Sequence, residues 1–491
     1  MPKHAEATTT NDTLDPADWN EFSALAHRAL DDALAYLRGV RERPVWQTVP
    51  SDVRRELTER VPRAASDLAA VYDQFARCVL PYPTGNIHPR FWGWVMGTGT
   101  PFAVVAEMLA STMNTHVAGY DQSATLVEEQ TVAWLCELMG FPSNATGVFV
   151  SGGTMANLQG LVAGVNAGAG FDVREQGLRD APPLAIYAST QTHHWIVKAC
   201  ELVGLGRRSL RRIPVDAGSR MVVADLERAI RADRAAGVRP VCVVGTAGTV
   251  NTGATDDLAA LAALCRAENV WFHVDGAFGA LAKLSPKLAP LVRGIEDADS
   301  LAFDLHKWGF LPYGVGCTLY RRKDDVARAF ASQASYIAPL GRGIAPDDLR
   351  FASRGIELSR PFRALKVWMS MKAHGVDGWA RMFEKNVAQA QHLARLVERE
   401  PALELAAPVP MNIVCLRVRA PSANAAESDA LNREVLLRVQ ESGVAIPSST
   451  QIGGRFAIRV CITNHRTRSE DLDLFVARVL DIARAIESER R

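Results

Sequence analysis

Hydrophobic positions in the first hundred residues recur at helical spacing. Between residues 22 and 37, and again between 68 and 79, apolar side chains return every three or four positions, which predicts two amphipathic helices. Asp15 and the proline after it predict the start of the first helix, and Ser66 predicts the start of the second. We therefore expect a helical segment over residues 1–100.

The pattern changes near residue 100, where short apolar runs begin to alternate with longer helical stretches. Runs of β-branched and aromatic residues at 148–150, 241–244 and 270–274 read as buried strands. This alternation is typical of an α/β domain with a mainly parallel sheet covered on both faces. We expect that domain to span residues 101–385, with its ligand bound beyond the carboxyl ends of the strands.

The order of strand-like and helical patterns changes again in the last part of the chain. Strand-like runs at 413–418 and 456–460 are each followed by a helical stretch, which predicts a small α+β domain over residues 386–491. The polar stretch 447–450, Pro-Ser-Ser-Thr, predicts a loop of that domain.

Composition narrows the classes of function. Of 491 residues, 48% are hydrophobic and 22% are charged, the balance of a soluble globular protein. The 55 basic and 54 acidic residues almost cancel, so neither a nucleic acid nor a membrane surface is favoured as a partner. The eight cysteines lack metal-ligand spacing, and the chain has no apolar run long enough for a membrane span or a secretory signal. We expect buried thiols, no metal, a cytoplasmic location and a small-molecule substrate.

A glycine-rich turn is the first candidate site. Gly152, Gly153 and Thr154 follow the strand at 148–150 and open a helix. Free N–H groups at a helix start, with glycines that allow close approach and a nearby hydroxyl, can hold a phosphate group. An ordinary tight turn between a strand and a helix would fit the same residues.

A carboxylate and a lysine follow two later strands. Asp275 ends an apolar strand, where a carboxylate needs a cationic partner such as a protonated pyridine nitrogen, although it could also cap the next loop. Lys307 ends another apolar run beside Trp308, where desolvation can remove its proton and make it a nucleophile toward a carbonyl. A lysine whose stem lies along the sheet edge is the alternative. The phosphate loop, the carboxylate and the lysine, in that order, favour a pyridoxal 5′-phosphate (PLP) site.

Two of these motifs also resemble those of a known family. His306-Lys307-Trp308 and His273-Val274-Asp275 are similar to the cofactor motifs of the PLP-dependent group II decarboxylases, which include the aromatic-L-amino-acid decarboxylases. The resemblance runs from about residue 88 to the end of the chain and is densest between Gly147 and Tyr320. It implies a PLP-dependent transferase-like large domain of fold-type I, decarboxylation of an amino acid, and a homodimer.

The resemblance also implies roles for individual residues. Lys307 would hold the cofactor as a Schiff base, and Asp275 would pair with its ring nitrogen. The other positions implied around the cofactor are His193 on one ring face, with His194 as a rival, Ala277 on the opposite face, Thr246 beside the ring, and Gly152, Gly153, Thr154 and His306 at the phosphate.

A later segment bears on the choice of reaction. Residues 331–336 resemble the mobile catalytic loop of these decarboxylases, and Tyr336 stands where the family's tyrosine donates the proton that replaces the lost carboxylate. Related aldehyde synthases place phenylalanine there, so the tyrosine favours simple decarboxylation, although an ordinary surface aromatic would also fit. One departure is Asp304-Leu305 in place of Asn-Pro before the lysine motif, since a carboxylate there would repel a phosphate.

The resulting hypothesis is a PLP-dependent decarboxylase that releases an amine and carbon dioxide from an L-amino acid. An aromatic substrate is preferred through the family likeness and the aromatic-rich stretch 91–102, while small or acidic amino acids remain open. The alternatives are other PLP chemistry on the same fold, by an aldehyde synthase or an aminotransferase, and a non-catalytic binding protein that kept the fold.

Overall fold

The structure, a computed structural model, describes residues 13–331, 340–345 and 350–490. The chain forms two compact units, Met1–Thr84 and Gly85–Arg491. The division into three parts expected from the sequence stays a prediction.

Among its described residues, the first unit contains three α-helices, α1 Trp19–Arg38, α2 Ser51–Glu56 and α3 Leu68–Cys78. The two helices expected from the apolar spacing are α1 and α3.

Both predicted caps of these helices are wrong. Asp18 caps α1, because its carboxylate reaches the free backbone N–H groups of Asn20 and Glu21 at 2.7 and 3.2 Å. Asp15 lies too far upstream to do so. Asp67, rather than its neighbour Ser66, caps α3 in the same way.

Seven strands among the described residues form the central sheet of the second unit, in the order β1-β7-β6-β5-β4-β2-β3. They are β1 Thr146–Val150, β2 Leu184–Ser189, β3 Leu210–Ile213, β4 Arg239–Thr246, β5 Trp271–Asp275, β6 Ser300–Asp304 and β7 Gly316–Tyr320. The strands β3, β2, β4, β5 and β6 are parallel, and β7 is antiparallel to both β6 and β1. The predicted mainly parallel sheet is confirmed.

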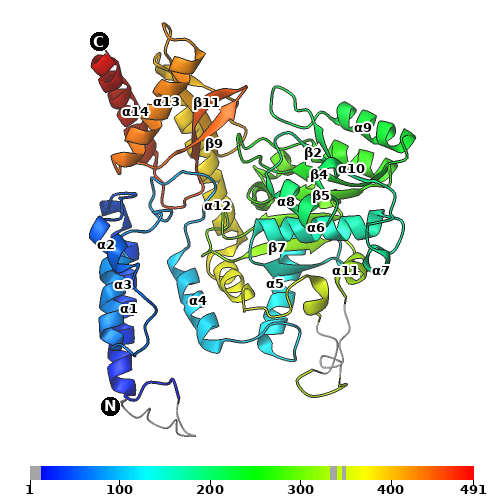
Figure 1. Cartoon of the computed structure of the whole chain (residues 1–491), viewed down its shortest axis with the longest axis horizontal. Coiled ribbons are helices and arrows are strands. Elements are labelled where there is room, and N and C mark those ends of the chain that lie inside the picture. Colours follow the sequence, from blue (N-terminus) through cyan, green and yellow to red (C-terminus); the bar gives the residue numbers. More distant parts are fainter. Residues whose placement is uncertain (1–12, 332–339, 346–349, 491) are drawn as a thin grey trace. The chain divides into compact units, whose positions relative to one another are not determined.

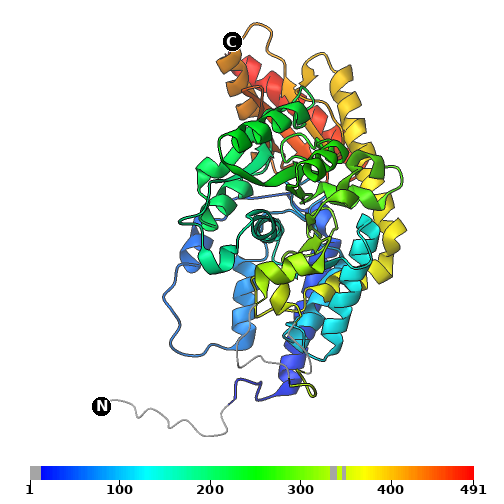
Figure 2. The same ribbon diagram turned by 90° about the vertical axis from the view of Figure 1, so that its right-hand side faces the viewer.

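Helices cover both faces of this sheet (Figure 1). The rings of Trp271 and His273 on β5 lie against α6 (Gly153–Gly168), which Figure 2 views nearly end-on. Phe272, between these two residues, points to the other face and lies beside α10 (Leu258–Ala267). The other helices before residue 331 are α4 Pro101–Met113, α5 Ser123–Met139, α7 Val173–Gln176, α8 Trp195–Leu202, α9 Val223–Ala235 and α11 Lys323–Phe330.

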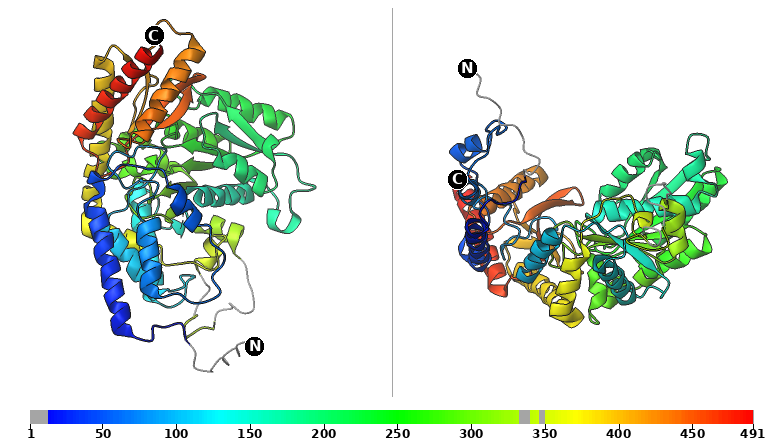
Figure 3. Two further views of the ribbon diagram at one scale, coloured as in Figure 1. Left: turned by 60° about the vertical axis from the view of Figure 1, so that its left-hand side comes forward. Right: turned by 90° about the horizontal axis from the view of Figure 1, so that it is seen from below.

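A long helical segment, α12 (Ala364–Arg399), leads to the C-terminal part of this unit. Gly375 interrupts it with φ 65° and ψ 162°, a conformation that breaks the helix and that glycine adopts at little cost. An antiparallel sheet of order β10-β11-β9-β8 follows, packed with α13 and α14 around a second hydrophobic core (Figure 3). Its elements are β8 Leu403–Leu405, β9 Ile413–Val418, α13 Ala425–Glu441, β10 Ser448–Ile452, β11 Arg455–Cys461 and α14 Ser469–Arg490.

The predicted loop at 447–450 is wrong, because Ser448–Ile452 forms the edge strand β10. This strand pairs with β11 on one side, and only Ser448 is fully buried. An edge strand with one exposed face needs few apolar residues, so its sequence looks like that of a loop.

The eight cysteines are all buried and form no disulfide bonds. Within the described ranges, no helix is long and apolar enough to cross a membrane, and His, Cys, Asp and Glu side chains form no group of three that could hold a metal ion.

Candidate active site

A cavity of about 400 Å³ lies at the carboxyl ends of the central strands. Nine of the ten residues predicted from the sequence line it: Gly152, Gly153, Thr154, His193, Thr246, Asp275, Ala277, His306 and Lys307. The tenth, Tyr336, lies outside the described residues. The structure therefore brings together residues that are up to 155 positions apart in the chain.

The glycine turn connects the end of β1 to the start of α6, and the residues of the first helical turn, whose N–H groups have no partner within the helix, line the cavity. A Cβ atom on Gly153 would come within 2.5 Å of the Asp304 carboxylate, and one on Gly152 within 3.0 Å of the His306 ring. The close approach leaves no room for a side chain at Gly153, and a side chain at Gly152 would need the His306 ring to shift. The turn can receive an anionic group, but a carboxylate lies beside it.

Asp275 is 3% exposed and accepts three hydrogen bonds at the end of β5. The donors are the Trp195 indole at 2.6 Å, the Ala277 backbone N–H at 3.1 Å and the Asn157 amide at 3.3 Å. These donors stabilise an ionised carboxylate that faces the cavity. The sequence interpretation missed both Asn157 and Trp195, although Asn157 stands one helical turn after Gly153 on α6 and so shares its face.

Lys307 forms an ion pair with Asp304, with 2.8 Å between Nζ and the carboxylate oxygen. Burial by itself would lower the pKa of Lys307, but Asp304, and Asp275 further away, raise that pKa above its ordinary value. The expectation that desolvation frees this lysine of its proton is therefore wrong for the protein without its cofactor, because the carboxylate three residues earlier stabilises the ammonium form.

Two histidines, His193 and His306, border the cavity. His193 lines it and His194 does not, which favours His193 as the ring-stacking residue. Burial lowers the pKa of His193 against the opposing effect of Asp275, and burial also lowers the pKa of His306. The Nδ1 atom of His306 is 3.0 Å from the carbonyl oxygen of Val315, which fixes its ring at the glycine turn.

Comparison with known proteins identifies the family. The family model described as the pyridoxal-dependent decarboxylase conserved domain matches residues 50–419, well over half of the chain. The chain belongs to the pyridoxal-dependent decarboxylase family. It is therefore a PLP-dependent amino-acid decarboxylase, and the hypothesis of a decarboxylase is confirmed.

This decarboxylase is similar to relatives along almost its full length. It is 33% identical to an aromatic-L-amino-acid decarboxylase of Bacillus atrophaeus, over 95% of this chain and 96% of the relative. It is 31% identical to an L-2,4-diaminobutyrate decarboxylase of Rhizobium meliloti, over 87% and 84% of the two chains. The crystal structure of Oryza sativa TDC with PLP and tryptamine superposes with a TM-score of 0.87 at 26% identity, covering 96% of this chain and all of the other, so the predicted fold class is confirmed.

The cavity of the decarboxylase fits PLP on its own contacts. Asp275 presents a buried acceptor for a pyridinium N–H, Lys307 presents an amine, and the start of α6 presents backbone N–H groups for a phosphate. The hydroxyl of Thr246 is buried in the cavity wall without a hydrogen-bond partner among the described residues, so it is available to a ligand. The charge of Asp304, which lies beside the glycine turn, opposes the phosphate.

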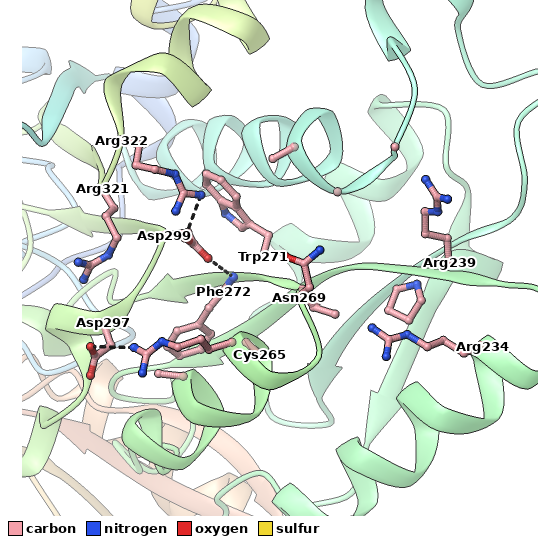
Figure 4. Close-up of a pocket in the computed structure, with 17 residues that line it drawn as sticks. Arg234, Arg239, Cys265, Asn269, Trp271, Phe272, Asp297, Asp299, Arg321 and Arg322 are labelled. Carbon is pink, nitrogen blue, oxygen red and sulfur yellow. Dashed lines mark hydrogen bonds and ion pairs between the residues drawn. The ribbon is translucent and has the colours of Figure 1, made fainter.

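A larger cavity of the decarboxylase, about 680 Å³, lies at the opposite, amino ends of β4 and β5 (Figure 4). Its wall carries arginines, among them Arg239 and Arg322, together with Trp271 and Asp299. None of the residues predicted for the cofactor lines it. This cavity has the larger volume, but the residues whose chemistry suits PLP line the smaller one.

Proposed function

We propose that this decarboxylase acts on an aromatic L-amino acid, with Lys307 as the amine that binds the cofactor and Asp275 as the partner of its ring nitrogen. The observation that carries the proposal is that both side chains face one cavity beside the glycine turn. The relatives named for aromatic-L-amino-acid and tryptophan decarboxylation support the substrate class.

An aromatic wall of the cavity supports an aromatic substrate. Trp94 lines the cavity and has φ 50°, a left-handed conformation that a tryptophan adopts only under constraint. Its backbone N–H donates to the Ser448 hydroxyl at 3.1 Å, and its carbonyl oxygen accepts from Arg459 at 2.8 Å. Val95 and Val250 add apolar surface to the same cavity. The C-terminal sheet thus fixes the backbone of Trp94 at the cavity, where its half-exposed indole ring can stack on an aromatic side chain.

Bound PLP supplies a conjugated ring that accepts the electron pair left when carbon dioxide departs. In this chain, Asp275 keeps a proton on the ring nitrogen because its own charge is stabilised by three donors. Lys307 would hold PLP through its amine, and the same amine would be available to release the amine product. His193, which lines the cavity, would cover one face of the ring and limit access of water to it. Tyr336 donates a proton to the substrate Cα atom.

We propose further that the protein is a homodimer in the cytoplasm. Large apolar side chains on one helix support the dimer, since Phe102, Met108 and Met113 of α4 are 40%, 48% and 52% exposed. Eight buried thiols without a disulfide bond fit a reducing compartment.

Borohydride trapping of the PLP-loaded enzyme followed by peptide mapping tests the cofactor assignment. We expect the label on Lys307 and its loss in Lys307→Ala, while the control Lys283→Ala, which removes a lysine paired with Glu296, keeps the label. An unlabelled Lys307 peptide would overturn the proposal.

A screen against the common amino acids tests the substrate and the reaction. A decarboxylase releases one amine for each carbon dioxide from an aromatic substrate and consumes neither oxygen nor a keto acid. Oxygen uptake with aldehyde formation would indicate an aldehyde synthase, and a requirement for a keto acid would indicate an aminotransferase.

A further inference from the structure

A continuous path of hydrogen bonds leads away from Asp275 between the sheet and α6. The Asn157 amide nitrogen lies 3.3 Å from Asp275, and its amide oxygen lies 2.8 Å from Nε2 of His273. Nδ1 of His273 is 2.8 Å from the Ser300 hydroxyl, which is 2.9 Å from the indole nitrogen of Trp271. None of these five side chains belongs to a residue more than 5% exposed, so water does not compete for the path.

The side chains of this path pack tightly between β5, β6 and α6. Trp271, His273 and Asp275 alternate along β5 and share one face, and His273 pairs with Ser300 across the parallel strands. A Cβ atom on Gly160 would lie 2.3 Å from the His273 ring, and one on Gly164 would lie 2.7 Å from the Trp271 ring. Two glycines four positions apart on α6 therefore make room for the two rings.

The two ends of the path determine the direction of its hydrogen bonds. An indole N–H can only donate, so Trp271 donates to the Ser300 oxygen. A carboxylate and a carbonyl oxygen can only accept, so the Asn157 amide nitrogen faces Asp275 and the Gly153 carbonyl oxygen, which lies at 2.8 Å. The Asn157 amide oxygen is then left to accept.

The directions of the hydrogen bonds in the middle of the path follow from those at its ends. Burial lowers the pKa of His273 to about 4, so its ring is neutral and carries one proton. The Asn157 oxygen requires that proton on Nε2, and Nδ1 then accepts from the Ser300 hydroxyl. Each of the four hydrogen bonds consequently points its donor hydrogen toward Asp275.

We propose that Trp271, Ser300 and His273 are positioning residues that act through Asn157 to hold the Asp275 carboxylate in its ionised form. Hydrogen bonds aligned head to tail polarise one another, and in a buried site this strengthens the last bond, which reaches the carboxylate. A carboxylate stabilised in this way leaves the proton on the pyridine nitrogen, where the reaction needs it. The inference rests on the proposed function in which Asp275 pairs with that nitrogen.

The far end of the path offers substitutions that do not touch the active site. Trp271 lies in the wall of the larger cavity, with the Arg322 guanidinium 5.8 Å from its ring centre (Figure 4). Neither Trp271 nor Ser300 lines the cofactor cavity. A change at either position can reach Asp275 only through the hydrogen-bonded path or through a general loosening of the fold.

The test compares Ser300→Ala with Ser370→Ala in enzymes loaded with PLP that carries nitrogen-15 in its ring. Ser370 is a matched control, because it is fully buried on α12 and its hydroxyl has no hydrogen-bond partner within the described ranges. We expect Ser300→Ala to move the ring-nitrogen resonance toward its unprotonated position. We also expect kcat to fall about fivefold, the factor for one hydrogen bond, with KM unchanged. Ser370→Ala should keep the wild-type resonance and kcat, and Trp271→Phe should shift the resonance in the same direction as Ser300→Ala.

A second measurement needs no cofactor. Nitrogen-15 spectra of histidine-labelled protein should show His273 neutral with its proton on Nε2 between pH 8 and 5. A proton on Nδ1, or an imidazolium at pH 7, would break the head-to-tail alignment of the hydrogen bonds at His273 and overturn the inference.

The outcomes separate this inference from the function on which it rests. If Asp275→Asn leaves the ring-nitrogen resonance unchanged, the role proposed for Asp275 fails. If Asp275→Asn moves the resonance and Ser300→Ala does not, the positioning path alone is refuted.

Discussion

Replacing Asp304 by asparagine tests whether the ion pair with Lys307 opposes cofactor binding. The substitution keeps the shape of the side chain and removes its charge. In the wild-type protein Lys307 must leave this pair to bind the cofactor, and the Asp304 carboxylate is then left buried beside the phosphate turn. Asparagine removes both the cost of breaking the ion pair and the repulsion between the carboxylate and the phosphate. PLP should therefore bind Asp304→Asn more tightly.

The magnitude follows from the burial of the two partners. The Asp304 side chain is 1% exposed and that of Lys307 is 24% exposed, with 2.8 Å between the charged atoms. Separating a fully buried pair costs about 3–5 kcal/mol, and the partial exposure of Lys307 reduces this to roughly half. About 1.5–2.5 kcal/mol corresponds to a roughly 10- to 60-fold lower Kd.

The assay is a titration of the protein without cofactor with PLP, followed by absorbance at several pH values. Asp304 raises the pKa of Lys307, and only the deprotonated amine can bond to the cofactor, so wild-type affinity should increase with pH up to that pKa. In Asp304→Asn the increase should begin at lower pH. Asp299→Asn is a control that removes a largely buried carboxylate at the other cavity. Equal or weaker PLP binding by Asp304→Asn would refute the reasoning.

Three further predictions address other parts of the chain. Tyr336→Phe should lose clean amine formation and release aldehyde with oxygen uptake, which product analysis measures; an unchanged amine yield would remove Tyr336 from the role of proton donor. Glu128→Ala should lower the free energy of unfolding by about 3–5 kcal/mol in urea titrations, because it leaves the fully buried Arg360 unpaired. Glu129→Ala, which breaks a more exposed pair, should cost less than about 1 kcal/mol, and equal losses would contradict the argument. Burial raises the pKa of Asp256 from 3.8 to about 6, so the folded state binds more protons than the unfolded state in this range and its stability should fall as pH rises. Asp256→Asn should remove that contribution, so its stability relative to wild type should rise with pH in a denaturation series, and a constant difference would refute the assignment.

The sequence predicted the large sheet and most of the cofactor cavity for one physical reason. Parallel strands bring their carboxyl ends to the same edge, so residues that directly follow strands meet there whatever their separation along the chain. Asp275 ends β5, Gly152 and Lys307 lie just after β1 and β6, and all three line one cavity.

Local sequence patterns gave wrong predictions in two situations. In one, two nearby polar residues could each cap a helix, and in the other, a strand is buried on one face only. Asp18 caps α1 in place of Asp15, and Asp67 caps α3 in place of Ser66, because only a side chain at the first turn reaches the free N–H groups. The polar edge strand Ser448–Ile452 obtains its hydrogen bonds from β11, which no local pattern reveals.

By itself, then, the sequence determined which chemical groups this decarboxylase carries and the order in which strands present them. Only the tertiary structure decided the partners of those groups, such as Asn157 for Asp275 across 118 residues, and the carboxylate that keeps Lys307 protonated. The reason is that the charge state of a buried group depends on distances of a few ångströms to all its neighbours, and those distances are set by packing between elements rather than by spacing along the chain.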